Sequence, residues 1–187
     1  DDALAFYEAE RTRLKDGDDF LPERARNYFN TAQLLLRKHE RAKAADYLAK
    51  ARSALLALQS QHPGHNDAAR RAVLLGRACR SLGALKAEEG HRGEALNLFK
   101  EAVAALEPAA GSGEKDRGTR LECASAWYEL GRRARSDGKT AAAVAALEKI
   151  PALLEAKAGG AELTHPERFL LARSRIEQGL AQRDGGA

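Results

Sequence analysis

Trp127-Tyr128-Glu129-Leu130-Gly131 is the stretch of this sequence that indicates its fold. The same spacing of leucine and glycine occurs 48 residues earlier, where Cys79-x2-Leu82-Gly83 matches Trp127-x2-Leu130-Gly131. Both stretches lie inside long apolar-periodic runs, where a helical glycine costs about 1 kcal/mol relative to alanine. A glycine that recurs in register predicts that a second helix backbone comes too close at that point to allow a Cβ atom.

The glycines extend this period along the chain. Glycines seven residues apart occur in the same phase three times, as Gly83 with Gly90, Gly131 with Gly138, and Gly179 with Gly186. A fixed period of about 20 to 50 residues is typical of repeat proteins. We therefore expect stacked helix pairs, in which the second glycine of each pair lies in the turn that ends a helix.

The composition favours an all-α fold. Ala and Leu dominate an apolar fraction of 44%, whereas aromatic residues make up 5%, and this balance suits helices better than strands. No run approaches the roughly 18 apolar residues of a membrane span, and no signal-peptide pattern opens the chain. The chain starts inside a helix-like run and contains no Met, so we expect it to be a segment of a longer protein.

Proline and glycine mark the expected ends of the helices. Pro22 and Pro166 suit first helical turns, whereas residues 110–113 and 159–160 read as a loop and a helix end. Helices are predicted near residues 2–15, 22–38, 41–61, 67–89, 91–107, 116–137, 140–157 and 166–183. Pro151 should kink the helix over 140–157, because proline has no backbone N–H to donate.

Alternate helices share a second pattern. The spacing Ala-x3-Phe-x2-Ala occurs at residues 95–102, and an apolar version of it occurs at residues 143–150 and 44–51. Together with residues 127–131, this resembles the tetratricopeptide repeat, whose motif runs Trp-x2-Leu-Gly-x2-Tyr, a turn, then Ala-x3-Phe. Two features depart from that motif: the aromatic residue after the glycine is missing, and the period is 48 to 51 residues rather than about 34.

The resemblance implies an α-α solenoid of antiparallel helix pairs with a right-handed superhelical twist over residues 1–187. The full repeats would span residues 22–61, 67–107 and 116–157, with a partial repeat or capping helix at 2–15 and another at 166–187. Long-period repeats of this style also resemble arrays attached to bacterial serine/threonine kinases. In that setting the segment would recruit substrates or sense signals within a larger signalling protein.

In the tetratricopeptide family, the first helices of successive repeats line a concave groove that holds an extended peptide or a helix. Carried over by repeat phase, the groove residues expected to bind a partner are Arg26, Phe29, Gln33, Arg37, Arg77, Arg80, Tyr128, Arg132, Arg135, Arg173 and Arg183. Arg outnumbers Lys 21 to 10 in the chain, and guanidinium pairs bidentately with carboxylate or phosphate. We therefore expect a protein-protein interaction scaffold whose partner is an acidic or phosphorylated protein segment.

Other interpretations of the same charges stay open. Charges on a helix face are usually just solvated, and this chain uses Arg in preference to Lys throughout. The segment could also self-associate through terminal helices, at residues 2–15 and 166–183. Nucleic acid is a weaker candidate, because a net charge of +4 and few aromatic residues provide little phosphate binding or base stacking.

The sequence shows no catalytic or metal-binding motif. It has no phosphate loop, no Gly-x-Gly-x-x-Gly and no His-Glu-x-x-His, and no set of nucleophile, base and orienting residue. We therefore expect neither an enzyme nor a cofactor. His62 and His65 have no third ligand nearby and suit an inter-repeat turn better than a metal site.

Three further residues are expected in the interior. Trp127, the single tryptophan of the chain, should fill the space between paired helices. Cys79 and Cys123 fall on apolar helix faces, so we expect two buried thiols, with a disulfide between them as the alternative. Thiols would fit a cytosolic or otherwise reducing compartment.

Overall fold

A computed structural model describes residues 5–7, 9, 21–61, 68–111, 116–155 and 162–185 of the chain. Over these residues the regular secondary structure is helical and contains no strand. The helices are α2 (Leu21–Arg37), α3 (Arg41–Gln61), α4 (Ala68–Glu88), α5 (Arg92–Leu106), α6 (Arg117–Ser136), α7 (Thr140–Leu147), α8 (Lys149–Leu154) and α9 (His165–Gly185). The predicted all-α fold is therefore confirmed.

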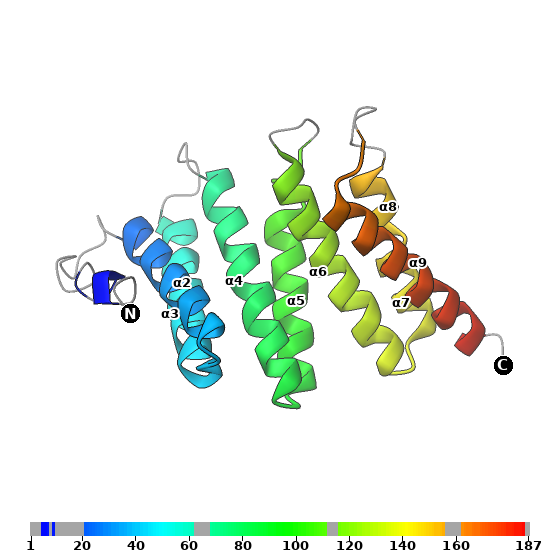
Figure 1. The fold of residues 1–187 in the computed structure, drawn as a ribbon, viewed down its shortest axis with the longest axis horizontal. Helices are drawn as coiled ribbons and strands as arrows, with labels where there is room; N and C mark the ends of the chain where they lie inside the picture. Colours follow the sequence, from blue (N-terminus) through cyan, green and yellow to red (C-terminus); the bar gives the residue numbers. More distant parts are fainter. Residues whose placement is uncertain are drawn as a thin grey trace. The chain divides into compact units, whose positions relative to one another are not determined.

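Helices pack against their neighbours in the sequence, in two compact units, Asp1–Ala95 and Leu96–Ala187. In the first unit α2 pairs with α3, and both contact α4. In the second unit α6 packs against α7 and α8, and α9 contacts all three (Figure 1). Helix α5 begins in the first unit and continues into the second. The helix pairs are antiparallel, because short turns join helices that lie side by side.

The turns after α2, α4 and α6 have the same hydrogen-bond pattern. In each one, a backbone N–H just past the helix donates to a carbonyl five residues earlier, which satisfies a carbonyl at the helix end. The donor and acceptor residues are Glu40 and Leu35, His91 and Lys86, and Lys139 and Ala134, each at 2.9 Å. The residue before each donor has a positive φ, 61° at His39, 85° at Gly90 and 71° at Gly138. The predicted turn glycines Gly90 and Gly138 are confirmed, and His39 takes the equivalent place where the sequence has no glycine.

The two mid-helix glycines of the C-terminal unit differ in their surroundings. A Cβ atom built on Gly131 would lie 2.6 Å from Cγ of Leu147 and 3.3 Å from the carbonyl oxygen of Ala143. The predicted close approach of a second helix is therefore confirmed at Gly131. No described atom lies within 4 Å of a Cβ atom built on Gly179. The same prediction is wrong at Gly179, because no described helix packs over that face of α9.

Pro151 divides the helix that the sequence predicts over residues 140–157. Helix α7 ends at Leu147 and α8 begins at Lys149. Leu147 is the residue whose carbonyl the missing N–H of Pro151 would have bonded, and the proline ring crowds that carbonyl. The break leaves Leu147, Ile150 and Leu154 all buried. The other described helix bounds agree with the predictions to within two residues.

The core consists of small and medium apolar side chains. In the second unit, Ala134, Ala143 and Ala181 form a cluster that brings α6, α7 and α9 together. Cys79 and Cys123 are buried as predicted. Trp127 differs from its prediction, because it is only half-buried and borders a cavity rather than filling the core.

Several predicted features lie outside the described residues. They are most of the helix expected over 2–15, the histidines of the 62–67 turn and Gly186. No described helix is long and apolar enough to span a membrane.

Candidate functional site

The predicted partner-binding residues of the first unit lie on α2 and α4, which contact each other. Arg26, Phe29, Gln33 and Arg37 are spaced by three or four residues, so they lie along one face of α2. Arg26 and Arg37 are exposed, whereas Phe29 and Gln33 are half-buried. This face therefore presents two cations beside a partly accessible aromatic ring.

The α4 members of the set are less accessible. Arg77 and Arg80 are both half-buried, and both already interact with other groups of the protein. An incoming carboxylate would have to replace those interactions. The exposed arginines of α2 are therefore better placed to contact a partner than the arginines of α4.

In the second unit, an arginine predicted to face a partner instead joins two helices. Arg135 on α6 donates from Nη1 to Glu177 Oε2 at 2.8 Å and from Nε to Asp184 Oδ2 at 2.9 Å, both on α9. These hydrogen bonds, to Asp184 first and then to Glu177, raise the pKa of Arg135 above its ordinary value. The charge of Arg135 is thus neutralised within the protein.

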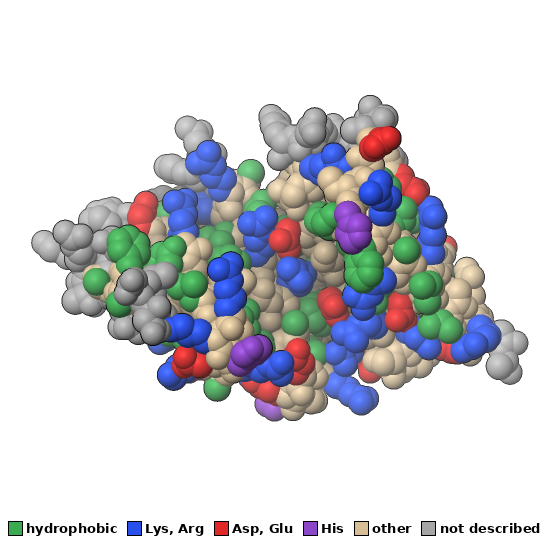
Figure 2. Space-filling model, in the orientation of Figure 1, with side chains coloured by type: hydrophobic (Ala, Val, Ile, Leu, Met, Phe, Trp, Pro, Cys, Tyr) green, Lys and Arg blue, Asp and Glu red, His purple; other side chains and the backbone are tan. Residues whose placement is uncertain are grey.

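Two further arginines of the predicted set also have acidic neighbours. Arg132 Nη2 donates to Glu129 Oε2 at 2.8 Å within α6, and this hydrogen bond raises the pKa of Arg132. Arg183 lies 3.9 Å from Asp184, which is a long contact for an ion pair. Figure 2 shows the result over α6 and α9, where basic and acidic side chains alternate. Carboxylates of the protein itself therefore lie beside three of the predicted arginines, Arg132, Arg135 and Arg183.

Arg173 is the exception. Its guanidinium carbon lies 4.9 Å from the ring centroid of Tyr128 and 5.5 Å from that of Phe169. No carboxylate among the described residues pairs with it. Tyr128 is only 4% exposed, because Arg173 and the neighbouring helix cover its ring. It is therefore not the open groove residue that the sequence predicted.

Large apolar side chains flank Arg173 on the same helix. Phe169 is 57% exposed and Ile176 is 63% exposed. They lie four residues before and three residues after Arg173, which places all three on one face of α9. We call Phe169, Arg173 and Ile176 the α9 face. It combines one stacked cation with two exposed apolar groups.

A buried ion pair holds the first turn of α9, and the sequence analysis did not identify it. Glu167 is 2% exposed and accepts hydrogen bonds from Arg117 Nη2 at 2.7 Å and from the hydroxyl and backbone N–H of Thr164, both at 2.7 Å. Burial alone would raise the pKa of Glu167, but the hydrogen bonds from Arg117 and Thr164 outweigh it and lower the pKa to about 2. The Thr-x-x-Glu spacing of a helix capping box was the signal available in the sequence.

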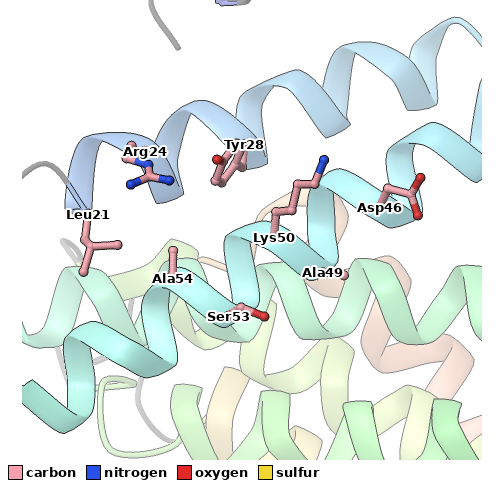
Figure 3. Close-up of a pocket in the computed structure, with 8 residues that line it drawn as sticks. All are labelled: Leu21, Arg24, Tyr28, Asp46, Ala49, Lys50, Ser53 and Ala54. Atoms are coloured by element: carbon pink, nitrogen blue, oxygen red, sulfur yellow. The ribbon is translucent and has the colours of Figure 1, made fainter. Parts of the chain in front are cut away.

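A hollow with a volume of about 550 Å³ lies between α2 and α3. Arg24 and Tyr28 reach it from α2, and Asp46, Lys50 and Ser53 reach it from α3 (Figure 3). Both signs of charge line it, and Lys50 Nζ lies 5.0 Å from the ring centroid of Tyr47. The hollow therefore offers apolar surface bordered by charges of both signs.

No group of three His, Cys, Asp or Glu side chains in the described part of the chain could hold a metal ion. The candidate site is a surface of arginine and apolar side chains. The described residues provide no metal centre there. Its most distinctive described element is the α9 face.

Comparisons with known proteins bear on the fold. No family model matches the sequence, and no curated protein matches it. The structure is similar to that of BtubC (BKLC) from P. vanneervenii, with a TM-score of 0.68 and 17% sequence identity. The similarity covers 97% of this chain but only 65% of that one. The chain has an all-α repeat fold. At this identity the likeness concerns the fold alone.

Proposed function

We propose that this chain is a non-catalytic protein-interaction module of the tetratricopeptide-repeat type, which binds an acidic or phosphorylated protein segment on its α9 face. The observation that carries the proposal is the position of Arg173 over the rings of Tyr128 and Phe169. Stacking restrains the guanidinium, so less side-chain entropy is lost when a carboxylate or phosphate binds to it.

The surroundings of Arg173 supply the rest of an interaction site. Arginine and aromatic side chains are enriched among the residues at the centre of protein interfaces. Phe169 and Ile176 are more than half exposed and provide apolar contact on both sides of the cation. A partner that alternates acidic and apolar residues would complement this face.

The ion pairs of α6 argue against two of the predicted arginines as partner contacts. Arg132 and Arg135 already have carboxylate partners in the protein, so a partner gains little by replacing them. The proposed contact is therefore centred on α9 rather than spread along every predicted arginine. Arg26 and Arg37 are exposed on α2 of the first unit and are not part of the contact proposed for α9.

Fluorescence anisotropy with labelled peptides tests the proposal. The probe is a peptide of alternating Glu and Leu or Phe, and the matched peptides carry Gln or Lys in place of every Glu. We expect saturable binding of the Glu peptide, with an affinity that falls as salt rises, and no binding of the Lys peptide. Arg173→Glu should weaken binding at least about tenfold, because a charge-assisted contact becomes a repulsive one.

Arg175→Glu is the matched control. It makes the same change in net charge two residues away, on the other side of the helix, where Arg175 pairs with Glu155 at 2.8 Å. We expect it to weaken binding much less than Arg173→Glu. Equal losses in the two variants would show that the peptide responds only to net charge, and the proposed site would be wrong.

Self-association is the second candidate function, and the exposed Phe169 and Ile176 favour it. The charge of α9 opposes it, because Arg168 and Arg173 are exposed on this helix without a carboxylate partner among the described residues, so two copies of this face would repel. We therefore expect light scattering over a concentration series to show a monomer. A dimer that Ile176→Asp dissociates would favour self-association over binding to an acidic partner.

A further inference from the structure

Helix α9 matches α6 in repeat phase, but the corresponding faces of the two helices differ in exposure. Ala124 and Gly131 of α6 are buried. Ala172 and Gly179, which occupy the equivalent positions of α9, are exposed. No described atom lies within 4 Å of a Cβ atom built on Gly179. This face of α9 is therefore uncovered in the described part of the second unit.

The packing of α7 on α6 shows what kind of element fits over such a glycine. A Cβ atom built on Gly131 would lie 2.6 Å from Cγ of Leu147 and 3.3 Å from the carbonyl oxygen of Ala143. Ala143 is 0% exposed and Leu147 is 1% exposed. A helix thus packs on Gly131 through an Ala-x3-Leu pair, and the missing Cβ lets its backbone approach. Gly179 offers a helix the same close approach.

Apolar side chains lie beside Gly179 along α9. Phe169, Ala172 and Ile176 lie ten, seven and three residues before it, a spacing that places all four on one side of the helix. We call Phe169, Ala172, Ile176 and Gly179 the Gly179 surface. The helix axis rises about 15 Å along it, which is enough for a second helix to pack over about three turns.

Cations border the Gly179 surface. Arg168 and Arg173 are exposed and have no carboxylate partner among the described residues. Their positions in the helical period place them on opposite edges of the surface. Arg183 lies one turn beyond Gly179 and is also exposed, 3.9 Å from Asp184. Charge complementarity therefore favours an occupant with acidic residues on both sides of its apolar face.

We propose that the Gly179 surface binds an amphipathic helix of a partner protein. An Ala-x3-Leu pair of that helix packs on Gly179 as Ala143 and Leu147 pack on Gly131, and its flanking Glu or Asp side chains pair with Arg168 and Arg173. This inference rests on the proposed function, because it keeps the acidic partner and assigns that partner a helical conformation.

A pair of labelled peptides tests whether the partner is helical. The probe has about 20 residues, enough to form a helix, with Ala-x3-Leu pairs along one face and Glu at the flanking positions. The matched peptide has the same composition, but its apolar and Glu residues strictly alternate. We expect the helical peptide to bind at least about tenfold more tightly and to gain helical circular dichroism when it binds. Equal affinities, or no gain in helicity, would overturn the proposal.

Gly179→Ala locates the contact without disturbing the fold. The added Cβ has free space in the described structure, whereas in the complex it would overpack against the bound helix. We expect binding of the helical peptide to weaken at least about fivefold. Gly118→Ala is the matched control, because it makes the same change at an exposed position of α6 with no described atom within 4 Å. It should leave binding unchanged, and equal affinities of the two variants would overturn the proposal.

Arg173→Glu separates this inference from the proposed function. If Arg173→Glu weakens binding of the helical peptide and Gly179→Ala does not, the acidic partner stands and the helix across Gly179 is wrong. If neither substitution weakens it, both proposals are wrong. Light scattering tests the remaining occupant: a dimer of the wild-type chain that Gly179→Leu dissociates would assign the surface to a second copy and overturn the partner helix.

Discussion

Gly131 and Leu147 are in direct contact, because Cγ of Leu147 occupies the space beside the glycine where a side chain would begin. A Cβ atom on Gly131 would be 2.6 Å from Cγ and 2.8 Å from Cδ2 of Leu147. Leu147 is also only 1% exposed, so it has little room to move away. The glycine therefore sets how closely α6 and α7 pack.

Gly131→Ala should destabilise the protein by about 1–3 kcal/mol. The gain in helix propensity is about 1 kcal/mol, but overpacking against Leu147 and the backbone of α7 outweighs it. Urea unfolding followed by circular dichroism measures the difference. An unchanged or increased unfolding midpoint would mean that α7 moves aside without cost.

Gly179→Ala should have the opposite sign, although Gly179 lies in the same phase 48 residues later. The position is exposed and helical, and no described atom lies within 4 Å of an added Cβ. The remaining effect is the higher helix propensity of alanine, so we expect the substitution to stabilise the protein by up to about 1 kcal/mol. The same urea titration serves as the test, and destabilisation would show that this face of α9 is covered in solution.

His39→Gly should stabilise the α2–α3 turn by roughly 0.5–1 kcal/mol. His39 has a φ of 61°, which is unfavourable for a residue with a Cβ atom and ordinary for glycine. Thermal unfolding should show a higher midpoint. Lys38→Gly is the control, because Lys38 does not have a positive φ and should lose stability from added chain entropy. A rise for both variants would contradict the argument from φ.

The free energy of unfolding should decrease at acidic pH because Glu167 becomes protonated. Its pKa is lowered from an ordinary 4.5 to about 2 in the folded protein, so the unfolded chain takes up a proton at a higher pH than the folded one. The stabilisation is therefore complete above about pH 4.5 and is lost as the pH falls toward 2. A shift of this size corresponds to a contribution on the order of 3 kcal/mol.

Glu167→Gln tests this contribution without removing the side chain. It should lower the free energy of unfolding at neutral pH and flatten the part of the acid dependence that comes from this carboxyl. Measurements of unfolding free energy between pH 2 and 7 would show the difference. A variant curve parallel to that of the wild type would mean that Glu167 titrates normally in the folded state.

Arg173→Lys should weaken binding of the Glu peptide severalfold, although the charge is kept. Lysine has no planar group to lie over the rings of Tyr128 and Phe169, and it cannot pair bidentately with a carboxylate. Peptide anisotropy measures the loss, and thermal unfolding should change little because the position is exposed. Equal affinities would indicate that charge alone, without the stacked geometry, accounts for binding.

The sequence by itself determined the features that depend on neighbours along the chain. Alanine and leucine periodicity located the helices, the glycines of the turns located the positive φ angles at Gly90 and Gly138, and Pro151 located the break between α7 and α8. Gly131 was also predictable, because its cost within a helix is local and its recurrence implies a contact. These features arise from backbone conformation over a few residues.

Only the tertiary structure decided which charges pair and which side chains stay accessible. Glu167 and Arg117 are 50 residues apart in the sequence, and Arg135 is 42 residues from Glu177, so no local pattern assigns these partners. The same docking of α9 on α6 buries Tyr128 beneath Arg173, and the packing of α5, α6 and α7 leaves a cavity beside Trp127. Helical periodicity tells which residues share a face, but the partner of that face depends on how the helices pack together, and that packing is set by contacts between residues far apart in the chain.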